Sequence, residues 1–229
     1  MFDRVLRIGT RTSLLALKQV EEALGYLKEF YPQVQAEIVG IDTYGDKDKI
    51  TPISEIEGKD FFTAEIDEAL LRGDIDFAVH SAKDLPDEIP AGLIIAAITK
   101  SIDPYDALVS KGNLNIDEFR RGAKIGASSL RRKTQLKKYR KDFRVVDIRG
   151  NIEERLEKLD KDGLDAIIVA SCALMRLGLE DRITQRIPFE ILRPHPLQGS
   201  LAIAVRENDK EIINLFRKLD MRKEIVRGD

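Results

Sequence analysis

The segment Arg4-Val-Leu-Arg-Ile-Gly-Thr-Arg-Thr-Ser13 carries the first clear structural signal of the chain. Its first half is rich in Val, Leu and Ile, which predicts a short strand, and its polar second half ends at Ser13, a residue type favoured at helix N-caps. Apolar residues then recur at helical spacing as far as Leu27, Pro32 stops the helix, and alternation resumes over residues 34–38. This order predicts a parallel pair of strands joined by a right-handed crossover through a helix.

The same succession of elements continues to residue 98 and restarts after residues 101–104. Pro194-His195-Pro196 predicts a rigid extended segment. The strand expected at 200–205 and the helix expected at 211–219 have no partner in the second half, so we expect the chain to return to the first. The other expected elements are a helix through 62–70, strands at 75–79, 93–98, 123–127, 143–148 and 166–170, and helices at 129–139 and 152–159.

These elements predict an α/β fold of two lobes, each a mixed, mostly parallel sheet flanked by helices, with a cleft between the lobes. We expect lobe 1 to comprise residues 1–99 and 197–220, and lobe 2 to comprise residues 100–196. Residues 221–229 would form a tail.

The composition is that of a folded globular chain. The 229 residues include 43% hydrophobic and 34% charged residues, with a formal net charge of -2. No apolar run approaches the roughly 20 residues that cross a bilayer, so we expect a cytoplasmic protein without a membrane partner. The single cysteine, Cys172, excludes an internal disulfide, and with only His80 and His195 a histidine-based metal site is not expected.

Positive charge is concentrated between Arg120 and Arg155, where thirteen basic residues against four acidic ones leave a local excess of nine. Such an excess favours a surface that binds anions. Nucleic acid is not the expected partner, because aromatic residues make up only 6% of the chain and there is no tryptophan to stack on bases.

Several polar loops directly follow predicted strands, and ligands of parallel sheets bind at that edge, near free helix N-termini. Arginine binds carboxylates and phosphates in paired geometry, so basic side chains there predict a small polyanionic ligand. Asp84 is the one carboxylate among them, and it would stabilise a positive charge that develops in a reaction. An equally simple interpretation is that Lys83 and Asp84 close a turn before Pro86. The basic side chains are Arg11, Lys83, Arg131, Arg132, Arg149, Arg155 and Arg176.

Two stretches are highly specific: Val79-His-Ser-Ala-Lys-Asp-Leu-Pro86 and Gly126-Ala-Ser-Ser-Leu-Arg-Arg132. At these stretches the sequence resembles the porphobilinogen deaminase family, also called hydroxymethylbilane synthases, of tetrapyrrole and heme biosynthesis. Further stretches match the family in the family's own order, and together the matches cover nearly the whole chain. The further matches are Arg7-Ile-Gly-Thr-Arg-Thr-Ser13, Gly45-Asp46, Gly58-Lys59, Asp103-Pro104, Arg149-Gly-Asn151, Arg155, Arg176-Leu-Gly-Leu179 and Gln198-Gly199.

The resemblance implies a fold similar to type II periplasmic binding proteins and assigns roles to single residues. Asp84 would be catalytic, stabilising positive charge as ammonia leaves porphobilinogen and the next pyrrole attacks. The residues implied to hold substrate side chains are Arg11, Arg149, Arg155 and Arg176. Those implied to hold the acidic side chains of a dipyrromethane cofactor are Ser13, Lys83, Ser129, Arg131 and Arg132.

In the family, a cysteine in a Gly-Gly-Cys loop of a third domain carries the cofactor, and we expect that domain to begin near Asp229, where this sequence stops. Cys172 is a second candidate for the attachment, although a lone cysteine at a strand end is more simply a small buried residue. The resemblance therefore implies a transferase that condenses porphobilinogen units with loss of ammonia, monomeric or with the third domain on a separate chain. The alternative is a homologue that binds anionic oligopyrroles without turnover.

Overall fold

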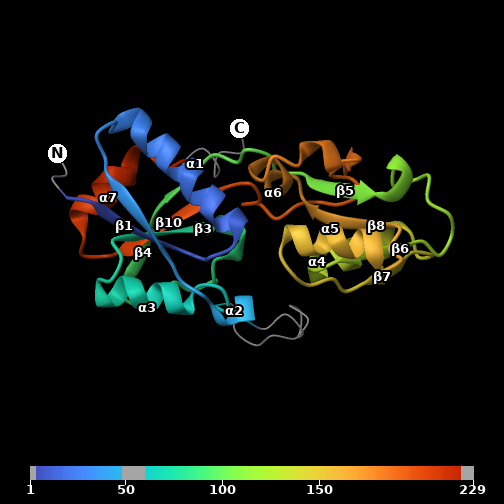
Figure 1. Cartoon of the computed structure of the whole chain (residues 1–229), viewed down its shortest axis with the longest axis horizontal. Helices are drawn as coiled ribbons and strands as arrows, with labels where there is room; N and C mark the ends of the chain where they lie inside the picture. Colours follow the sequence, from blue (N-terminus) through green and yellow to red (C-terminus); the bar gives the residue numbers. More distant parts are fainter. Residues whose placement is uncertain (1–3, 48–59, 223–229) are drawn as a thin grey trace. The chain divides into compact units, whose positions relative to one another are not determined.

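The computed structural model describes residues 4–47 and 60–222. The described chain divides into two compact units: unit 1 holds residues 4–47, 60–101 and 200–222, and unit 2 holds residues 102–199. The blue N-terminal elements and the red C-terminal elements in Figure 1 therefore belong to the same unit. The Gly58-Lys59 match and residues 223–229 of the expected tail lie outside the described residues.

Unit 1 is built on a five-stranded mixed sheet. Its elements are β1 (Leu6–Thr10), α1 (Leu14–Phe30), β2 (Ala36–Gly40), α2 (Tyr44–Lys47), α3 (Ala64–Arg72), β3 (Phe77–Ser81), β4 (Leu93–Ile98), β10 (Leu201–Arg206) and α7 (Lys210–Phe216). The strand order is β2-β1-β3-β10-β4. β1 pairs in parallel with β2 and β3, whereas β10 is antiparallel to β3 and β4, so only β10 runs against the other strands of this sheet.

The central strands of unit 1 are buried on both faces. Phe77 and Val79 of β3 pack in one core cluster with α1 and α7, whereas Ala78, which points to the opposite face, packs with α3. Phe77 meets Phe216 of α7 edge to face, with ring centroids 4.7 Å apart. The two helical layers thus hold the sheet and its loops in place.

Unit 2 repeats this arrangement. Its elements are β5 (Asp106–Ser110), β6 (Lys124–Ala127), α4 (Leu130–Tyr139), β7 (Arg144–Val146), α5 (Ile152–Lys161), β8 (Ala166–Ala170), α6 (Ser171–Arg176) and β9 (Gln185–Arg186). The strand order is β7-β6-β8-β5-β9, with β6 parallel to β7 and β8, and β5 antiparallel to β8 and β9. All of β8 is buried, and α5 packs against it.

The predicted α/β fold of two mixed sheets flanked by helices is confirmed. In each sheet the antiparallel strand is the first strand after the chain crosses from the other unit: β5 follows the crossing at residues 101–102, and β10 follows the crossing at residues 199–200. The sequence pattern did not predict β5, α6, α2 or β9. A cleft between the units stays a prediction. Within the described ranges, no helix combines the length and the apolar character that spanning a bilayer requires.

Candidate functional site

In unit 1, two of the predicted loops share one edge of the sheet. β1 and β3 are parallel neighbours, with Gly9 opposite Ala78, so the loops that follow them leave the sheet at the same edge. The side chain of Gln19 on α1 strengthens this arrangement, because its Nε2 donates to Ser81 Oγ at 2.7 Å. The structure therefore brings Arg11 and Ser13 to the same edge as Lys83 and Asp84.

Local backbone structure explains two of these residues. Ser13 is the N-cap of α1, and its Oγ accepts a hydrogen bond from the backbone N–H of Ala16 at 3.3 Å, as the sequence predicted. Lys83 and Asp84 lie in a single turn of 3₁₀ helix over Ala82–Asp84, where Asp84 is exposed and Lys83 is half-buried. The carboxylate of Asp84 is thus open to solvent at the end of a buried strand.

Arg11 has a counter-ion that the sequence pattern did not predict. Its Nε lies 3.1 Å from both carboxylate oxygens of Asp46, its Nη2 also contacts Asp46, and its guanidinium lies over the ring of Phe62, 4.4 Å from the centroid. Burial opposes ionisation of Asp46, but the hydrogen bonds and charge of Arg11 prevail and hold the pKa of this carboxyl below its usual value. Arg11 is therefore oriented before any ligand binds.

His80 lies beneath this edge, in the strand that leads to Asp84. It is 6% exposed, and its Nε2 is buried without a hydrogen-bond partner among the described residues. Burial lowers the pKa of His80 to about 4, although the charge of Asp84 favours protonation. His80 is therefore neutral at physiological pH.

In unit 2, the parallel strands β6, β7 and β8 end at one edge, and Ser129, Arg149 and Arg176 follow them. β5 runs antiparallel to β8, with Asp106 opposite Ala170, so the first residue of β5 lies at this same edge. This register places a buried carboxylate among the predicted basic residues.

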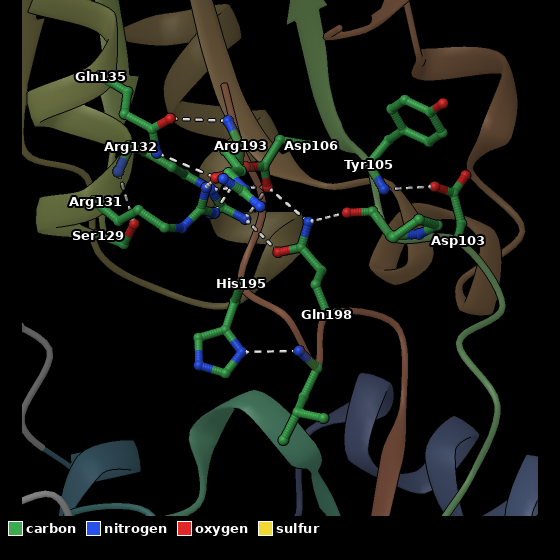
Figure 2. Close-up of polar contacts among 12 residues, drawn as sticks. Asp103, Tyr105, Asp106, Ser129, Arg131, Arg132, Gln135, Arg193, His195 and Gln198 are labelled. Atoms are coloured by element: carbon green, nitrogen blue, oxygen red, sulfur yellow. Dashed lines mark hydrogen bonds and ion pairs between the residues drawn. The ribbon is translucent and has the colours of Figure 1, made fainter. Parts of the chain in front are cut away.

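Asp106 pairs with both arginines of the Ser-Ser-Leu-Arg-Arg motif (Figure 2). Its carboxylate lies 2.7 Å from Nη2 of Arg131 and 2.6 Å from Nη2 of Arg132. Ser129 is the N-cap of α4, and its Oγ accepts from the backbone N–H of Arg132 at 3.2 Å. The cap and the ion pairs together orient the first turn of α4.

Two of the remaining predicted arginines of unit 2, Arg155 and Arg176, donate to main-chain carbonyls. Arg155 Nε donates to the carbonyl of Gly150 at 2.8 Å, and Arg176 Nη2 donates to the carbonyl of Gly199 at 2.8 Å. The carbonyl of Arg149 in turn accepts from Lys158 Nζ at 2.8 Å. All three arginines are half-buried, so each keeps part of its surface accessible.

The structure thus gathers the predicted site residues into two groups, one at a sheet edge of each unit. That both groups line one cleft stays a prediction. The expectation that Asp84 is the one carboxylate among the basic residues is wrong, because Asp46 and Asp106 pair directly with Arg11, Arg131 and Arg132. Asp84 differs from both in being exposed.

Two residues of the site were missed for identifiable reasons. Asp46 belongs to a quoted motif, but nothing in the local pattern connects it with Arg11, 35 positions earlier. Asp106 precedes the buried run Ala107–Val109, and that run after Pro104 was the available signal for a strand.

Metal ligands and Cys172 are two further features to consider at these edges. Within residues 4–47 and 60–222, no three His, Cys, Asp or Glu side chains gather in a way that could hold a metal ion. Cys172 is 3% exposed in the first turn of α6. Its burial fits the interpretation as a small core residue.

Comparison with known proteins decides the family. The family model described as "Porphobilinogen deaminase, dipyromethane cofactor binding domain" matches residues 6–214. The chain belongs to the porphobilinogen deaminase family. The porphobilinogen deaminase of Pelotomaculum thermopropionicum is 46% identical over 220 residues, which are 96% of this chain and 70% of the relative. The enzyme of Natranaerobius thermophilus is 47% identical, over 96% of this chain and 72% of the relative.

A third porphobilinogen deaminase, from Geobacter metallireducens, is 45% identical over 93% of this chain and 66% of its own length. The chain thus spans roughly two thirds to three quarters of the length of these family members. The family predicted from the sequence is confirmed, and the named relatives support the predicted transferase function.

Solved structures agree on the fold. A nutrient-binding protein from Burkholderia cenocepacia bound to methionine aligns with a TM-score of 0.58 at 14% identity, covering 96% of this chain and 93% of that one. The methionine-binding protein MetQ aligns with a TM-score of 0.55 at 17% identity, covering 97% and 92%. The predicted similarity to type II periplasmic binding proteins is confirmed for the fold.

The matching family model is that of a cofactor-binding domain, in agreement with the predicted dipyrromethane. The donors present fit the carboxylate side chains of such a group. Lys83 and Arg131 are half-buried cations, and Ser13 and Ser129 are hydroxyls at the first turns of helices, where free N–H groups favour anions. Each of the two groups of residues therefore supplies donors for the acidic side chains of a pyrrole.

Proposed function

We propose that the chain is a transferase that condenses porphobilinogen units head to tail with loss of ammonia. In each step the bond between the aminomethyl carbon and its nitrogen breaks, and ammonia leaves. A new carbon–carbon bond then forms to a free position of another pyrrole, which releases a proton. Porphobilinogen and anionic oligopyrroles would be the partners, and we further propose that the protein acts as a cytoplasmic monomer.

Asp84 is the proposed catalytic residue. When ammonia leaves, positive charge develops on the pyrrole and its methylene carbon, and a nearby fixed carboxylate lowers the energy of that state. Pyrrole N–H groups are donors, so the same carboxylate can hold the ring in place by accepting from them. The exposure of Asp84 at the end of β3 supports this role, because a substrate can reach it.

The arginines are proposed to hold the acetate and propionate side chains. Arg11, Arg149, Arg155 and Arg176 would hold substrate, and Lys83, Arg131 and Arg132, with Ser13 and Ser129, would hold the cofactor. When bound, the dipyrromethane cofactor would supply the acidic pyrrole chain to which new units are joined. Arg11 is held by Asp46 and Phe62 in advance, which reduces the entropy lost when it binds a carboxylate.

The single observation that carries the proposal is the exposed carboxylate of Asp84 on the sheet edge that also carries Arg11 and Lys83. Cations there can bind the acidic side chains of a substrate, while the carboxylate stabilises the positive charge that develops as ammonia leaves.

The test is ammonia release from porphobilinogen by the purified chain and by an Asp84→Asn variant. We expect the variant to lose about 100-fold or more of the rate, because one charge-stabilising group at a reacting centre contributes about that much. Asp74→Asn is the matched control. Asp74 is exposed, lies before β3 instead of after it, and pairs with Arg72 on the surface. We expect this control to keep the full rate.

Two outcomes would contradict the proposal. Equal rates for Asp84→Asn and the parent chain would remove the catalytic role of Asp84. Calorimetric binding of porphobilinogen without ammonia release, even after host extract is added, would instead identify a homologue that only binds.

A further inference from the structure

Asp106 is a buried carboxylate of unit 2 that accepts hydrogen bonds from three side chains. It is 0% exposed, and Figure 2 shows side chains approaching it from α4 and from the segment around Gln198. Its Oδ1 accepts from Arg132 Nε at 3.0 Å, from Arg132 Nη2 at 2.6 Å and from Gln198 Nε2 at 3.0 Å. Its Oδ2 accepts from Arg131 Nη2 at 2.7 Å. Both oxygens are therefore engaged by donors that converge from different parts of the chain.

One carboxylate is thus shared by two guanidinium groups. Burial by itself would raise the pKa of Asp106, but the charges and hydrogen bonds of Arg132 and Arg131 prevail and hold it below the usual value. Asp106 is ionised at physiological pH, and it neutralises only one of the two positive charges. The group keeps a net positive charge that can meet an anion.

The two arginines differ in what they can still bind. The side chain of Arg132 is 6% exposed, whereas that of Arg131 is 27% exposed. Arg131 donates from Nη2 to Asp106 and from Nη1 to the carbonyl of Arg193. A guanidinium has five N–H groups, so Arg131 keeps donors beyond these contacts and has the solvent access that a ligand needs. Arg132, which is almost fully buried, keeps less access to a ligand than Arg131 does.

Gln198 holds the carboxylate of Asp106 from the other side. It is 1% exposed, and its Nε2 donates to Asp106 Oδ1 and, at 2.8 Å, to the carbonyl of Pro104. Its Oε1 accepts from Arg132 Nη2 at 3.4 Å. The amide therefore satisfies Asp106 without adding charge, and its contact with Pro104 fixes the carboxylate relative to the start of β5.

We propose that Asp106, with Gln198, is a positioning residue that fixes the guanidinium of Arg131 in the orientation in which it holds an acidic side chain of the pyrrole ligand. This inference rests on the proposed function and extends it to two residues that do not themselves touch the ligand. Asp106 acts by sharing its charge between the two arginines. Arg132 is thereby held in the core, and Arg131 is held with part of its guanidinium accessible to solvent.

The experiment compares Asp106→Asn with Asp76→Asn in the full chain. Asp76 is the matched control because it is also buried, at 2% exposure, and its carboxylate pairs with Arg4 at 2.8 Å and with Arg7 at 3.1 Å. It lies before β3 in unit 1, away from the sheet edge that carries Asp84. Both variants remove a buried carboxylate that pairs with arginines, two at Asp106 and three at Asp76, where Arg206 is the third, so a loss of stability is expected in both.

Two measurements separate positioning from stability. The first is calorimetric binding of porphobilinogen, at a temperature where thermal melting shows both variants folded. We expect binding to weaken about tenfold or more in Asp106→Asn and to be unchanged in Asp76→Asn, since a charge-assisted hydrogen bond contributes at least that much. The second is the ¹⁵N NMR spectrum of arginine side chains. We expect the Arg132 Nε–H to exchange slowly in the parent chain, because it is buried against Asp106, and its signal to be lost or broadened in Asp106→Asn only.

The outcomes distinguish this inference from the proposed function. If the parent chain binds porphobilinogen and Asp106→Asn binds it equally well, the positioning role is overturned and the function stands. If the parent chain fails to bind, the proposed function fails, and an unchanged Arg132 signal in Asp106→Asn then overturns the positioning role separately. Should Asp106→Asn not fold, Gln198→Ala removes the neutral support alone, and unchanged binding and NMR signals in that variant would equally overturn the inference.

Discussion

His80 and Asp67 are two buried residues of unit 1 whose pKa values are displaced in opposite directions. Burial lowers the pKa of His80 to about 4. Burial also raises the pKa of Asp67 to about 6, against a hydrogen bond from Thr63 and with a further contribution from the charge of Asp60. Both groups therefore take up protons differently in the folded and unfolded chain over the same weakly acidic range.

The consequences for stability have opposite signs. Below about pH 6.5 the unfolded chain protonates His80 while the folded chain does not, so this residue lowers the free energy of unfolding as the pH falls towards 4. From about pH 6 downward the folded chain protonates Asp67 while the unfolded chain remains ionised until its ordinary pKa of 3.8, so this residue raises the free energy of unfolding. In the parent chain the two contributions largely cancel.

Single substitutions separate these contributions. As the pH falls from 7 to 4, we expect the free energy of unfolding of His80→Asn to rise relative to that of the parent chain by up to about 3 kcal/mol. Asp67→Asn is expected to change in the opposite direction. Urea unfolding at several pH values measures both, and comparing changes with pH removes any constant cost of the substitution. Curves for both variants that run parallel to the parent curve would contradict the prediction.

At the level of secondary structure, the N-terminus of α5 explains why a glycine stands at position 150 and an asparagine at position 151. Asn151 is the N-cap, its side chain accepts from the Glu154 N–H at 2.8 Å, and Glu154 accepts from the Asn151 N–H at 2.9 Å. Gly150 has φ +111, and a Cβ there would lie 2.4 Å from Glu154 Oε2. This capping box sets the direction of α5, which carries Arg155.

We expect Asn151→Ala to lower the free energy of unfolding by about 1 kcal/mol, because it removes the cap. The control is Glu157→Ala on the same helix, whose pair with Lys161 is exposed on both sides. Loss of such a pair is expected to change stability by only about 0.5 kcal/mol or less. Urea unfolding at pH 7 measures both variants. An equal loss in the two would show that the capping box contributes no more to the free energy of unfolding than an exposed ion pair does.

Most helices and strands could be predicted from sequence, because their signals are local. Ser13 and Pro32 mark the start and end of α1, and the apolar runs of β3 and β8 are buried as expected. β5 was missed because its run is short and begins with Asp106, a charged residue that is poor evidence for a buried strand. α6 was missed because it follows β8 without a loop.

At the level of the whole molecule, each unit has its own apolar core. Leu136 of α4 is fully buried with Ile125 and Ile168 in a cluster that belongs wholly to unit 2. In unit 1, Ile8 is fully buried in a cluster with Phe77 and Phe216. Because the buried contacts of each cluster stay within one unit, local opening of one core leaves the other intact.

We therefore expect Leu136→Ala to destabilise unit 2 by about 2–5 kcal/mol, the cost of a large-to-small change in a core. Hydrogen exchange followed by mass spectrometry should show faster exchange in peptides that contain β6 and β8, with β1 and β3 unchanged. Ile8→Ala is the reciprocal control, which should accelerate exchange in unit 1 only. A uniform acceleration across both units in either variant would mean that the chain opens as one cooperative body.

The amino-acid sequence alone was sufficient for the two α/β lobes, the family and the loops that follow the strands, since periodicity, caps and motifs are written within short stretches. The counter-ions of the predicted cations needed the folded chain. Asp46 reaches Arg11 and Asp106 reaches Arg131 and Arg132 across 35, 25 and 26 positions. Such pairs depend on strand order and on the antiparallel register of β5 against β8, which arise when distant segments pack together. No local pattern encodes them.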